Sequence, residues 1–240
     1  MNKQKLIIII PCYNEEESIE QLFLELEKID KKLSELYICS FLFVDDGSTD
    51  STHLLLSKNV ARLESVKIIQ HTVNQNLGMA LQTAIKSITD EDLVAFLDSD
   101  CTYEPKILFD LIDEINKGYD LVTVSPYHPD GRVDGVPEWR LLLSKGITLI
   151  YRILLWKKMY TFTAMVRVIK RDKIDVLVGT RSDFAFVAEM MISAIKRNYK
   201  ISEVPTVLKT REFGVSKMRL MNTIYAHLEI VWKLIKREKF

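Results

Sequence analysis

Short apolar runs alternate with amphipathic segments through the first half of the chain. Leu6–Ile10 is entirely apolar, as expected of a strand that is buried on both faces of a parallel sheet. The following segment opens a helix at Asn14–Glu17 and then carries apolar residues at helical spacing. Further strands are expected at Phe41–Val44, Val66–Gln70, Val94–Leu97 and Asp120–Val124, with a helix from Met79 to about Ile88. This order predicts an α/β fold with a parallel, doubly wound sheet and right-handed crossovers.

The pattern changes in the second half of the chain. Ser125–Glu138 is rich in proline and glycine, so we expect a loop there. Trp139–Trp156 is long and apolar, but Arg140, Lys145 and Arg152 make it a poor transmembrane helix. It fits better as a helix that is buried on one side or lies at a membrane interface. The remaining expected elements are a helix at Asp183–Arg197, an edge strand at Ile201–Leu208 because it contains Pro205, and an amphipathic helix at Met218–Phe240.

Composition narrows the class of protein. A chain of 240 residues fits one large domain, or one domain with an appendage. Its 33 basic and 33 acidic residues cancel, which argues against a nucleic-acid partner. The cysteines, Cys12, Cys39 and Cys101, are odd in number and scattered, which indicates a reducing, cytoplasmic setting. Leu6–Ile10 is too short for a secretory signal or a membrane span.

Two carboxylates close the strand expected at Val94–Leu97. Asp98 and Asp100 are two positions apart, so in an extended chain their side chains point the same way. They suit one divalent cation, or one of them holds the cation while the other holds a ligand hydroxyl. Mg²⁺ and Mn²⁺ prefer such oxygen ligands and often bridge a carboxylate to a diphosphate. The plainer alternative is an acidic turn after a strand.

Other expected strands also end in polar residues. In doubly wound sheets, ligands bind beyond the carboxyl ends of the strands. Asp45-Asp46-Gly47-Ser48 could be a turn with a helix N-cap, but its neighbours at the same sheet edge favour a nucleotide site. The residues expected at this edge are Tyr13, Asn14, Glu15, Asp45, Asp46, Asp98 and Asp100.

These motifs, in this order, resemble the inverting GT-A glycosyltransferases of family 2. The similarity rests on Pro11-Cys-Tyr-Asn-Glu15, Val44-Asp-Asp-Gly-Ser-Thr-Asp50, Asn76-Leu-Gly-Met-Ala80 and Asp98-Ser-Asp100. It implies a GT-A, Rossmann-like domain with a mostly parallel sheet, helices on both faces and a D-x-D metal motif. The later motifs are similar to those of dolichyl- or polyprenyl-phosphate mannosyltransferases and their glucosyl relatives. They are Arg140-Leu-Leu-Leu-Ser144, Glu189, Glu203-Val-Pro205 and Arg211-Glu-Phe-Gly-Val-Ser-Lys217.

The resemblance also implies roles for individual residues. Pro11, Tyr13 and Glu15 would line a nucleoside pocket, with Phe43 and Asp45 against the base or ribose. Asp98 and Ser99 would contact the ribose or sugar, and Asp98 and Asp100 would hold Mg²⁺ or Mn²⁺. Phosphates would be held by Arg140, Ser144, Arg211 and Lys217. The residues expected to carry catalysis are Asp100, Arg140, Arg211 and Lys217.

The implied reaction moves a hexose, mannose from GDP-mannose or glucose from UDP-glucose, to a lipid phosphate with inversion. A phosphate acceptor is largely dianionic at neutral pH and needs no strong general base. The enzyme would then lie on the cytoplasmic face of a membrane, alone or with a membrane-anchored subunit. We expect a catalytic domain at 1–217, split into a nucleotide-sugar half at 1–124 and an acceptor half at 125–217, and a terminal helix at 218–240.

Two alternatives keep the same motifs. One is a glycosyltransferase that acts on a saccharide or protein, for which an acidic residue near Glu189 would serve as base. The other is a non-catalytic subunit, which departures from the family pattern would favour. Thr102 stands where the family often has a Gln metal ligand. Ser125-Pro126-Tyr127 lacks the Arg that usually follows the fifth strand in the family, and Arg132 of the following loop would be its substitute. The third departure, Thr161-Phe-Thr-Ala-Met-Val-Arg167, replaces an Asp-x-Thr-x-x-Phe-Arg pattern.

Overall fold

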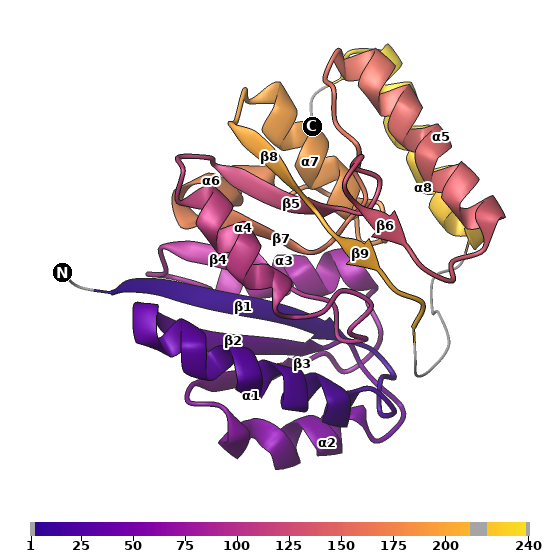
Figure 1. The fold of residues 1–240 in the computed structure, drawn as a ribbon. Coiled ribbons are helices and arrows are strands. Elements are labelled where there is room, and N and C mark those ends of the chain that lie inside the picture. Colours follow the sequence, from indigo (N-terminus) through magenta and orange to yellow (C-terminus); the bar gives the residue numbers. More distant parts are fainter. Residues whose placement is uncertain (1–2, 212–219, 239–240) are drawn as a thin grey trace.

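A computed structural model of the chain describes residues 3–211 and 220–238. In chain order, its strands are β1 (Gln4–Cys12), β2 (Tyr37–Asp45), β3 (Val66–Gln70), β4 (Leu93–Phe96), β5 (Leu121–Ser125), β6 (Arg132–Val133), β7 (Arg167–Lys170), β8 (Ile201–Pro205) and β9 (Val207–Leu208). Seven of these described strands form the central sheet, in the order β3-β2-β1-β4-β7-β5-β8 (Figure 1). β6 and β9 form a separate small sheet.

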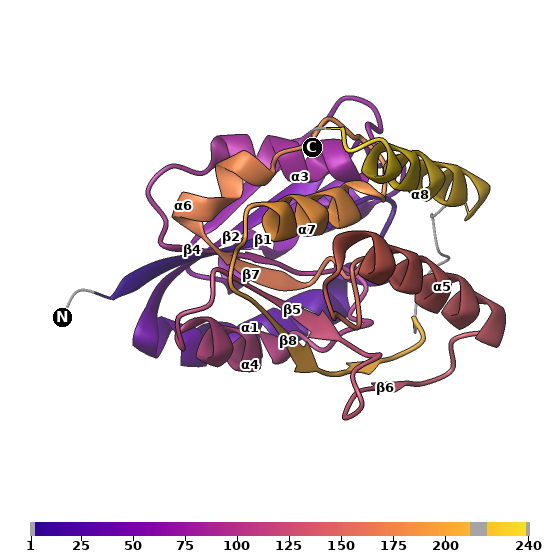
Figure 2. The same cartoon turned by 90° about the horizontal axis from the view of Figure 1, so that it is seen from above.

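Helices cover both faces of the central sheet. They are α1 (Ile19–Leu36), α2 (Thr52–Asn59), α3 (Leu77–Ser87), α4 (Ile107–Ile115), α5 (Glu138–Leu155), α6 (Arg171–Ile174), α7 (Phe186–Lys196) and α8 (Leu220–Ile235), with 3-10 turns at Val60–Arg62 and Asp175–Leu177. In Figure 2, α1 and α4 lie on one face and α3 and α7 on the other. α5 and α8 lie side by side beyond one end of the sheet (Figures 1 and 2). The α/β fold with helices on both faces is therefore confirmed.

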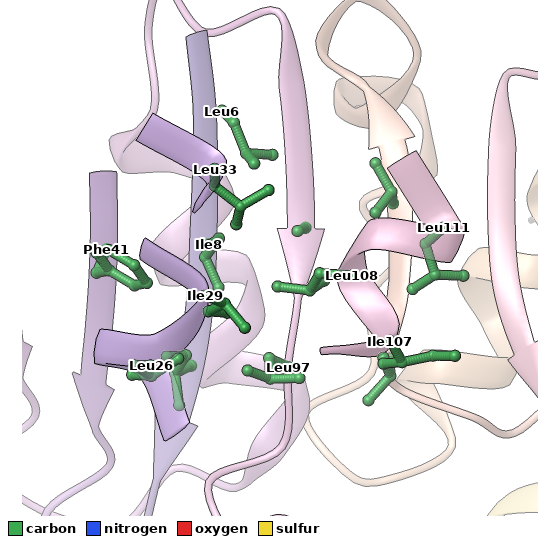
Figure 3. Close-up of a cluster of buried hydrophobic side chains, with 14 of the residues drawn as sticks. Leu6, Ile8, Leu26, Ile29, Leu33, Phe41, Leu97, Ile107, Leu108 and Leu111 are labelled. Carbon is green, nitrogen blue, oxygen red and sulfur yellow. The ribbon is translucent and has the colours of Figure 1, made fainter. Parts of the chain in front are cut away.

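The two cores follow from the alternation of side chains along β1. Leu6, Ile8 and Ile10 belong to the core on the α1 and α4 face, whereas Ile7 and Ile9 belong to the opposite core. Figure 3 shows part of the first core, where side chains of α1 and α4 meet β1. Burial on both faces explains why this strand is apolar throughout.

Among the described strands of the central sheet, β7 is the antiparallel member of the mostly parallel sheet that was expected. It lies between β4 and β5 and is antiparallel to both, with Arg167 opposite Phe96 and Lys170 opposite Leu93. The strand is only four residues long and has a basic residue at each end, so it carries little apolar signal of its own. Arg167 is fully buried, and its guanidinium donates to the carbonyls of Ala164 and Val187, which offsets part of the cost of burying it.

The segment around Pro205 is an edge strand, as expected. β8 pairs only with β5 among the described strands, and Pro205 closes it before the short strand β9 begins. The long apolar segment and the last segment also form helices, α5 and α8. None of the helices in the described ranges is long and apolar enough to cross a membrane.

Candidate active site

Three neighbouring strands end at one edge of the sheet, where a polar cleft of about 740 Å³ lies. β1 pairs in parallel with both β2 and β4, so the residues that follow these strands come together. Tyr13–Glu15 follow β1, Asp46 follows β2, and Asp98–Asp100 lie just beyond β4. The rest of the wall comes from distant segments, namely Asn74, Asn76, Leu77, Ala80, Met165, Asp183, Phe184, Arg211, Asn222 and Thr223.

Asp46, not Asp45, is the acidic residue of its turn that lines this cleft. Asp45 is the last residue of β2 and is fully buried, with its Oδ1 accepting from the Ser48 N–H at 3.0 Å. Its Oδ2 accepts from Gln70 Nε2 at 3.2 Å. The Asp45 carboxylate therefore closes the turn beneath the cleft, and its contact with a ligand stays a prediction.

Asp46 is held in place by a dense set of hydrogen bonds. Its Oδ1 lies 2.7 Å from His71 Nδ1 and accepts from the Gln75 N–H at 2.9 Å, while Oδ2 accepts from Asn74 Nδ2 at 3.0 Å. His71 Nε2 in turn lies 3.0 Å from Thr83 Oγ1 on α3. This network fixes the wall of the cleft at the end of β2.

Phe43 belongs to the hydrophobic core on the α1 face of the sheet. It is fully buried and stacks on Phe23 of α1, with the ring centroids 5.2 Å apart. Phe41 and Phe43 share one face of β2, and α1 covers that face. Phe43 thus supports the strand from within the core and does not line the cleft.

Carboxylates and one guanidinium meet at the centre of the cleft. Arg211 Nε and Nη2 lie 2.9 and 2.7 Å from Asp100 Oδ2. Its Nη1 donates to both carboxylate oxygens of Glu15, at 3.0 and 3.2 Å. Burial raises the pKa of Glu15, an effect that Arg211 opposes. Burial and the charge of Asp100 raise the pKa of Asp98, so the cluster carries more negative charge than it readily accommodates.

The residues at this point fit a hard divalent cation. Carboxylate oxygens of Asp98 and Asp100 face a cleft with excess negative charge, which a cation would relieve. In the described part of the chain, however, no three His, Cys, Asp or Glu side chains form a ready-made metal cage. The Thr102 hydroxyl donates to Asp100 Oδ1 at 2.9 Å, so it orients that carboxylate. Water and a bound diphosphate would have to complete the coordination.

A second cavity, of about 570 Å³, adjoins the polar cleft and is lined mainly by apolar side chains. We call it the apolar groove. α5 and α8 provide much of its apolar wall, through Leu142, Leu143, Gly146, Ile147, Ile150, Ile224 and Leu228. The polar residues Arg140, Ser144 and Tyr127 also line it. The groove and the cleft meet, since they share Leu77, Asp98, Met165, Phe184 and Thr223.

Two polar contacts hold α8 against the rest of the groove. Tyr151 of α5 is fully buried, and its hydroxyl lies 2.8 Å from His227 Nδ1 of α8. Burial lowers the pKa of His227 to about 4, so its imidazole is neutral near pH 7. Arg181 Nη1 donates to Glu229 of α8 at 2.8 Å, and Arg181 Nη2 pairs with Asp183 at 2.6 Å. α8 is therefore tied both to α5 and to the segment before α7.

Most of the residues expected from the sequence lie at these two cavities. The polar cleft contains Pro11, Tyr13, Glu15, Asp98, Ser99, Asp100 and Arg211, and the apolar groove contains Arg140 and Ser144. Lys217 lies outside the described residues. Arg132 pairs with Asp134 at 2.8 Å and lines neither cavity, so it does not replace the missing Arg after β5.

Sequence reasoning missed several cleft residues. Asn76 has a positive φ of 72°, which favours Asn, and it immediately precedes α3. Asp183 and Asn222 carry no local signal, since only the tertiary fold brings them to the β-strand ends.

Comparison with known proteins agrees with this arrangement. Residues 7–181 match the model of the family described as glycosyl transferase family 2. The polyprenol monophosphomannose synthase of Mycolicibacterium smegmatis is 31% identical over 221 residues, covering 90% of this chain and 81% of the relative. The dolichol-phosphate mannosyltransferase of Pyrococcus furiosus is 31% identical over 243 residues, covering 98% of this chain. This chain spans only 64% of the length of that second relative.

A solved structure shows the same fold at low sequence identity. It is the glucosyl-3-phosphoglycerate synthase of Mycobacterium tuberculosis in complex with Mn²⁺, uridine diphosphate and phosphoglyceric acid. The TM-score is 0.71 at 16% identity, and the match covers 98% of this chain and 78% of the other.

Proposed function

The chain belongs to glycosyl transferase family 2, and from this premise we propose that it transfers a hexose from a nucleotide diphosphate sugar to a polyprenyl or dolichyl phosphate. The observation that carries the proposal is the junction of two unlike cavities at Asp98. The polar cleft suits a nucleotide and diphosphate, whereas the apolar groove suits the hydrocarbon chain of a lipid. Relatives named for transfer to polyprenol or dolichol phosphate support the same acceptor class.

In the donor half, Asp98 and Asp100 would hold Mg²⁺ or Mn²⁺. Such an ion neutralises charge on a departing diphosphate. Tyr13 and Pro11 offer a surface for the nucleoside, and Asp46 offers carboxylate oxygens to base or ribose donors. Arg211 lies between Glu15 and Asp100, within reach of a phosphate placed in the cleft.

In the acceptor half, a phosphate oxygen of the lipid would attack the anomeric carbon from the face opposite the leaving diphosphate. The bond from that carbon to the diphosphate oxygen breaks as the new one forms, which inverts the centre. The dianionic acceptor needs no strong base. Glu189 itself is buried near the Arg181 N–H and lines neither cavity in the described structure. Asp183, an acidic residue near it, lines the polar cleft and is the candidate base for the alternative of a hydroxyl acceptor.

We propose mannose as the sugar, with GDP-mannose as donor, and glucose from UDP-glucose as the competitor. Nucleotide release from a panel of sugar donors tests this directly, with Mn²⁺ or Mg²⁺ present. Each donor is offered with a polyprenyl phosphate or with a soluble saccharide. Release that depends on the saccharide and not on the lipid phosphate would reject the proposed acceptor.

The roles that we propose for the two halves of the domain follow the order of the chain. Residues 1–124 supply the strand-end carboxylates of the nucleotide-sugar half, and residues 125–217 supply Arg140, Ser144 and Arg211 of the acceptor half. Residues 218–240 would act as an amphipathic terminal helix at a membrane surface. We place the enzyme on the cytoplasmic face of that membrane, either alone or with a membrane-anchored subunit.

Arg140→Ala should weaken use of the lipid phosphate more than use of the donor. Arg140 lines the apolar groove near the start of α5, and its guanidinium lies 5.3 Å from the centroid of the Trp139 ring. Losing one charge-assisted phosphate contact should raise the acceptor KM about tenfold. Steady-state kinetics with each substrate varied in turn measures this, with Arg132→Ala as the matched control. A change confined to the donor KM would contradict the assignment, and Lys217→Ala should behave like Arg140→Ala or affect both substrates.

We also expect direct association with anionic membranes. Large apolar side chains are exposed on both helices, including Leu142 (70%), Ile153 (61%) and Trp156 (93%) at α5 and Trp232 (57%) on α8. Lys233, Lys236 and Arg237 follow near the end of α8, as suits an anionic surface.

Flotation with anionic liposomes at low salt measures this association. Ile153→Ser/Trp156→Ser should reduce the bound fraction several-fold, whereas Leu36→Ser at the far end of α1 should not. A chain that ends near Lys217 separates the contribution of α8 from that of α5. Full-length protein that stays unbound without partners would reject direct association and favour recruitment by an anchored subunit.

A further inference from the structure

We propose that Glu203 is a positioning residue, which fixes the wall shared by the two cavities and thereby sets acceptor binding. The inference rests on the proposed function, because the acceptor in question is the lipid phosphate. Glu203 lies in β8, the edge strand of the sheet, opposite Thr123 of β5. It does not itself line the polar cleft or the apolar groove.

The carboxylate of Glu203 receives bonds from two consecutive backbone amides. The Tyr160 N–H approaches Oε1 at 3.0 Å and Oε2 at 2.8 Å, and the Thr161 N–H donates to Oε1 at 2.8 Å. Bonds from an N–H to an ionised acceptor are about twice as strong as neutral ones. Burial raises the pKa of Glu203, and these two amides oppose that shift because they favour the carboxylate.

The segment that contains these two amides forms part of the reaction centre. Residues 157–166 connect α5 to β7 without regular structure. Thr161, Thr163 and Ala164 line the apolar groove, and Met165 lines both cavities next to Asp98. A shift of this segment would move the groove wall and the junction together.

Packing in the core also fixes this segment. Phe162 is fully buried, and its ring lies 5.3 Å from that of Tyr151 on α5. Glu203 and Phe162 therefore both hold the segment, one through hydrogen bonds and the other through packing. Because α5 runs directly into this segment, Glu203 also restrains the C-terminal end of α5.

The chemistry requires a carboxylate of this length. Glutamine would present one carbonyl oxygen and one NH₂ group, so one backbone N–H would face another donor. Aspartate keeps the charge but is one methylene shorter. If the Glu203 hydrogen bonds served stability alone, their loss would alter the unfolding temperature but would not weaken acceptor binding more than donor binding. This difference makes the inference testable.

The test compares Glu203→Gln with wild type in three measurements. The acceptor KM should rise about tenfold. Alternatively, the Kd of a short, detergent-soluble polyprenyl phosphate, measured without donor, should rise about tenfold. Nucleoside diphosphate binding with Mn²⁺ should stay within about twofold, because the carboxylates of the cleft are untouched. Hydrogen exchange of the peptide that spans 157–166 should become faster. Glu203→Asp should recover part of the acceptor affinity.

Glu114→Gln is the matched control. Glu114 of α4 accepts from the Ser202 hydroxyl at 2.9 Å, so it contacts the neighbouring residue of the same strand but not the 157–166 segment. It should leave acceptor binding unchanged. Unchanged acceptor binding in Glu203→Gln despite faster exchange would overturn the inference, as would equal losses of both substrates.

Failure of the proposed function gives a different result. If wild type binds the lipid phosphate but transfers no sugar to it, the proposed reaction is wrong. Weaker lipid phosphate binding by Glu203→Gln would then still support the positioning role. If wild type does not bind the lipid phosphate at all, both the proposed acceptor and this inference are rejected.

Discussion

Asp100→Ala should lower turnover by on the order of 10³-fold, the loss expected when a metal that stabilises a leaving diphosphate is no longer held. Asp100 is the carboxylate that Thr102 orients from one side and Arg211 contacts from the other. Removing it leaves Asp98 as the remaining carboxylate of the D-x-D pair. The Arg211 guanidinium also loses one of its two acidic partners.

Two measurements separate loss of metal from loss of fold. Mn²⁺ binding in the presence of a nucleoside diphosphate, followed by calorimetry, should fall with turnover, while the unfolding temperature changes little. Asp113→Asn, an exposed acidic residue on α4, is the matched control and should retain activity. Full activity of Asp100→Ala in excess chelator would reject the metal role.

Arg211→Ala should lower kcat/KM by about 10²-fold or more. Arg211 is the guanidinium that bonds both Glu15 and Asp100, at the point where the strand-end carboxylates converge. In the proposed reaction it would also compensate charge on phosphate. Arg211→Lys keeps the charge but lacks the planar fork that spans two carboxylates, so it should recover only part of the activity.

The control for this prediction is close in the chain. Lys209→Ala removes a cation two residues away, which pairs with Glu104 outside the polar cleft, and should have little effect on catalysis. The measurement is kcat/KM for donor and acceptor in all three variants. An Arg211→Ala enzyme that keeps more than about a third of wild-type kcat/KM would show that the charge at this position is dispensable, against the large losses typical of such sites.

Much of the fold could be predicted because long apolar and amphipathic segments define their own elements. β1 and α1 are examples, since each buries a continuous apolar surface. β7 could not be predicted, because four residues beginning with a buried arginine resemble a polar connection. Its place in the sheet depends on β4 and β5, which pair with it from distant parts of the chain.

Part of the candidate site could likewise be predicted from the sequence, and part of it could not. Asp98 and Asp100 were predictable because they follow a buried strand, and parallel neighbours put strand ends at one edge. The choice between Asp45 and Asp46 depends on where β2 ends and its turn begins, which the turn motif alone does not reveal. The opposite wall, with Met165, Asp183 and Asn222, exists only after the second half of the chain has folded onto the first.

The antiparallel strand β7 also has a consequence for synthesis on the ribosome. β1 to β4 can pair as soon as the first hundred or so residues emerge, but one edge of β4 receives its partner only when Arg167–Lys170 has been made. Until then, the nascent chain exposes an unpaired, apolar strand edge, which is a hazard for aggregation. Pairing of Leu93 with Lys170 closes a long loop, a step that slows folding. The strand that covers the open edge of β4 therefore also ends the interval in which a chaperone would be most useful.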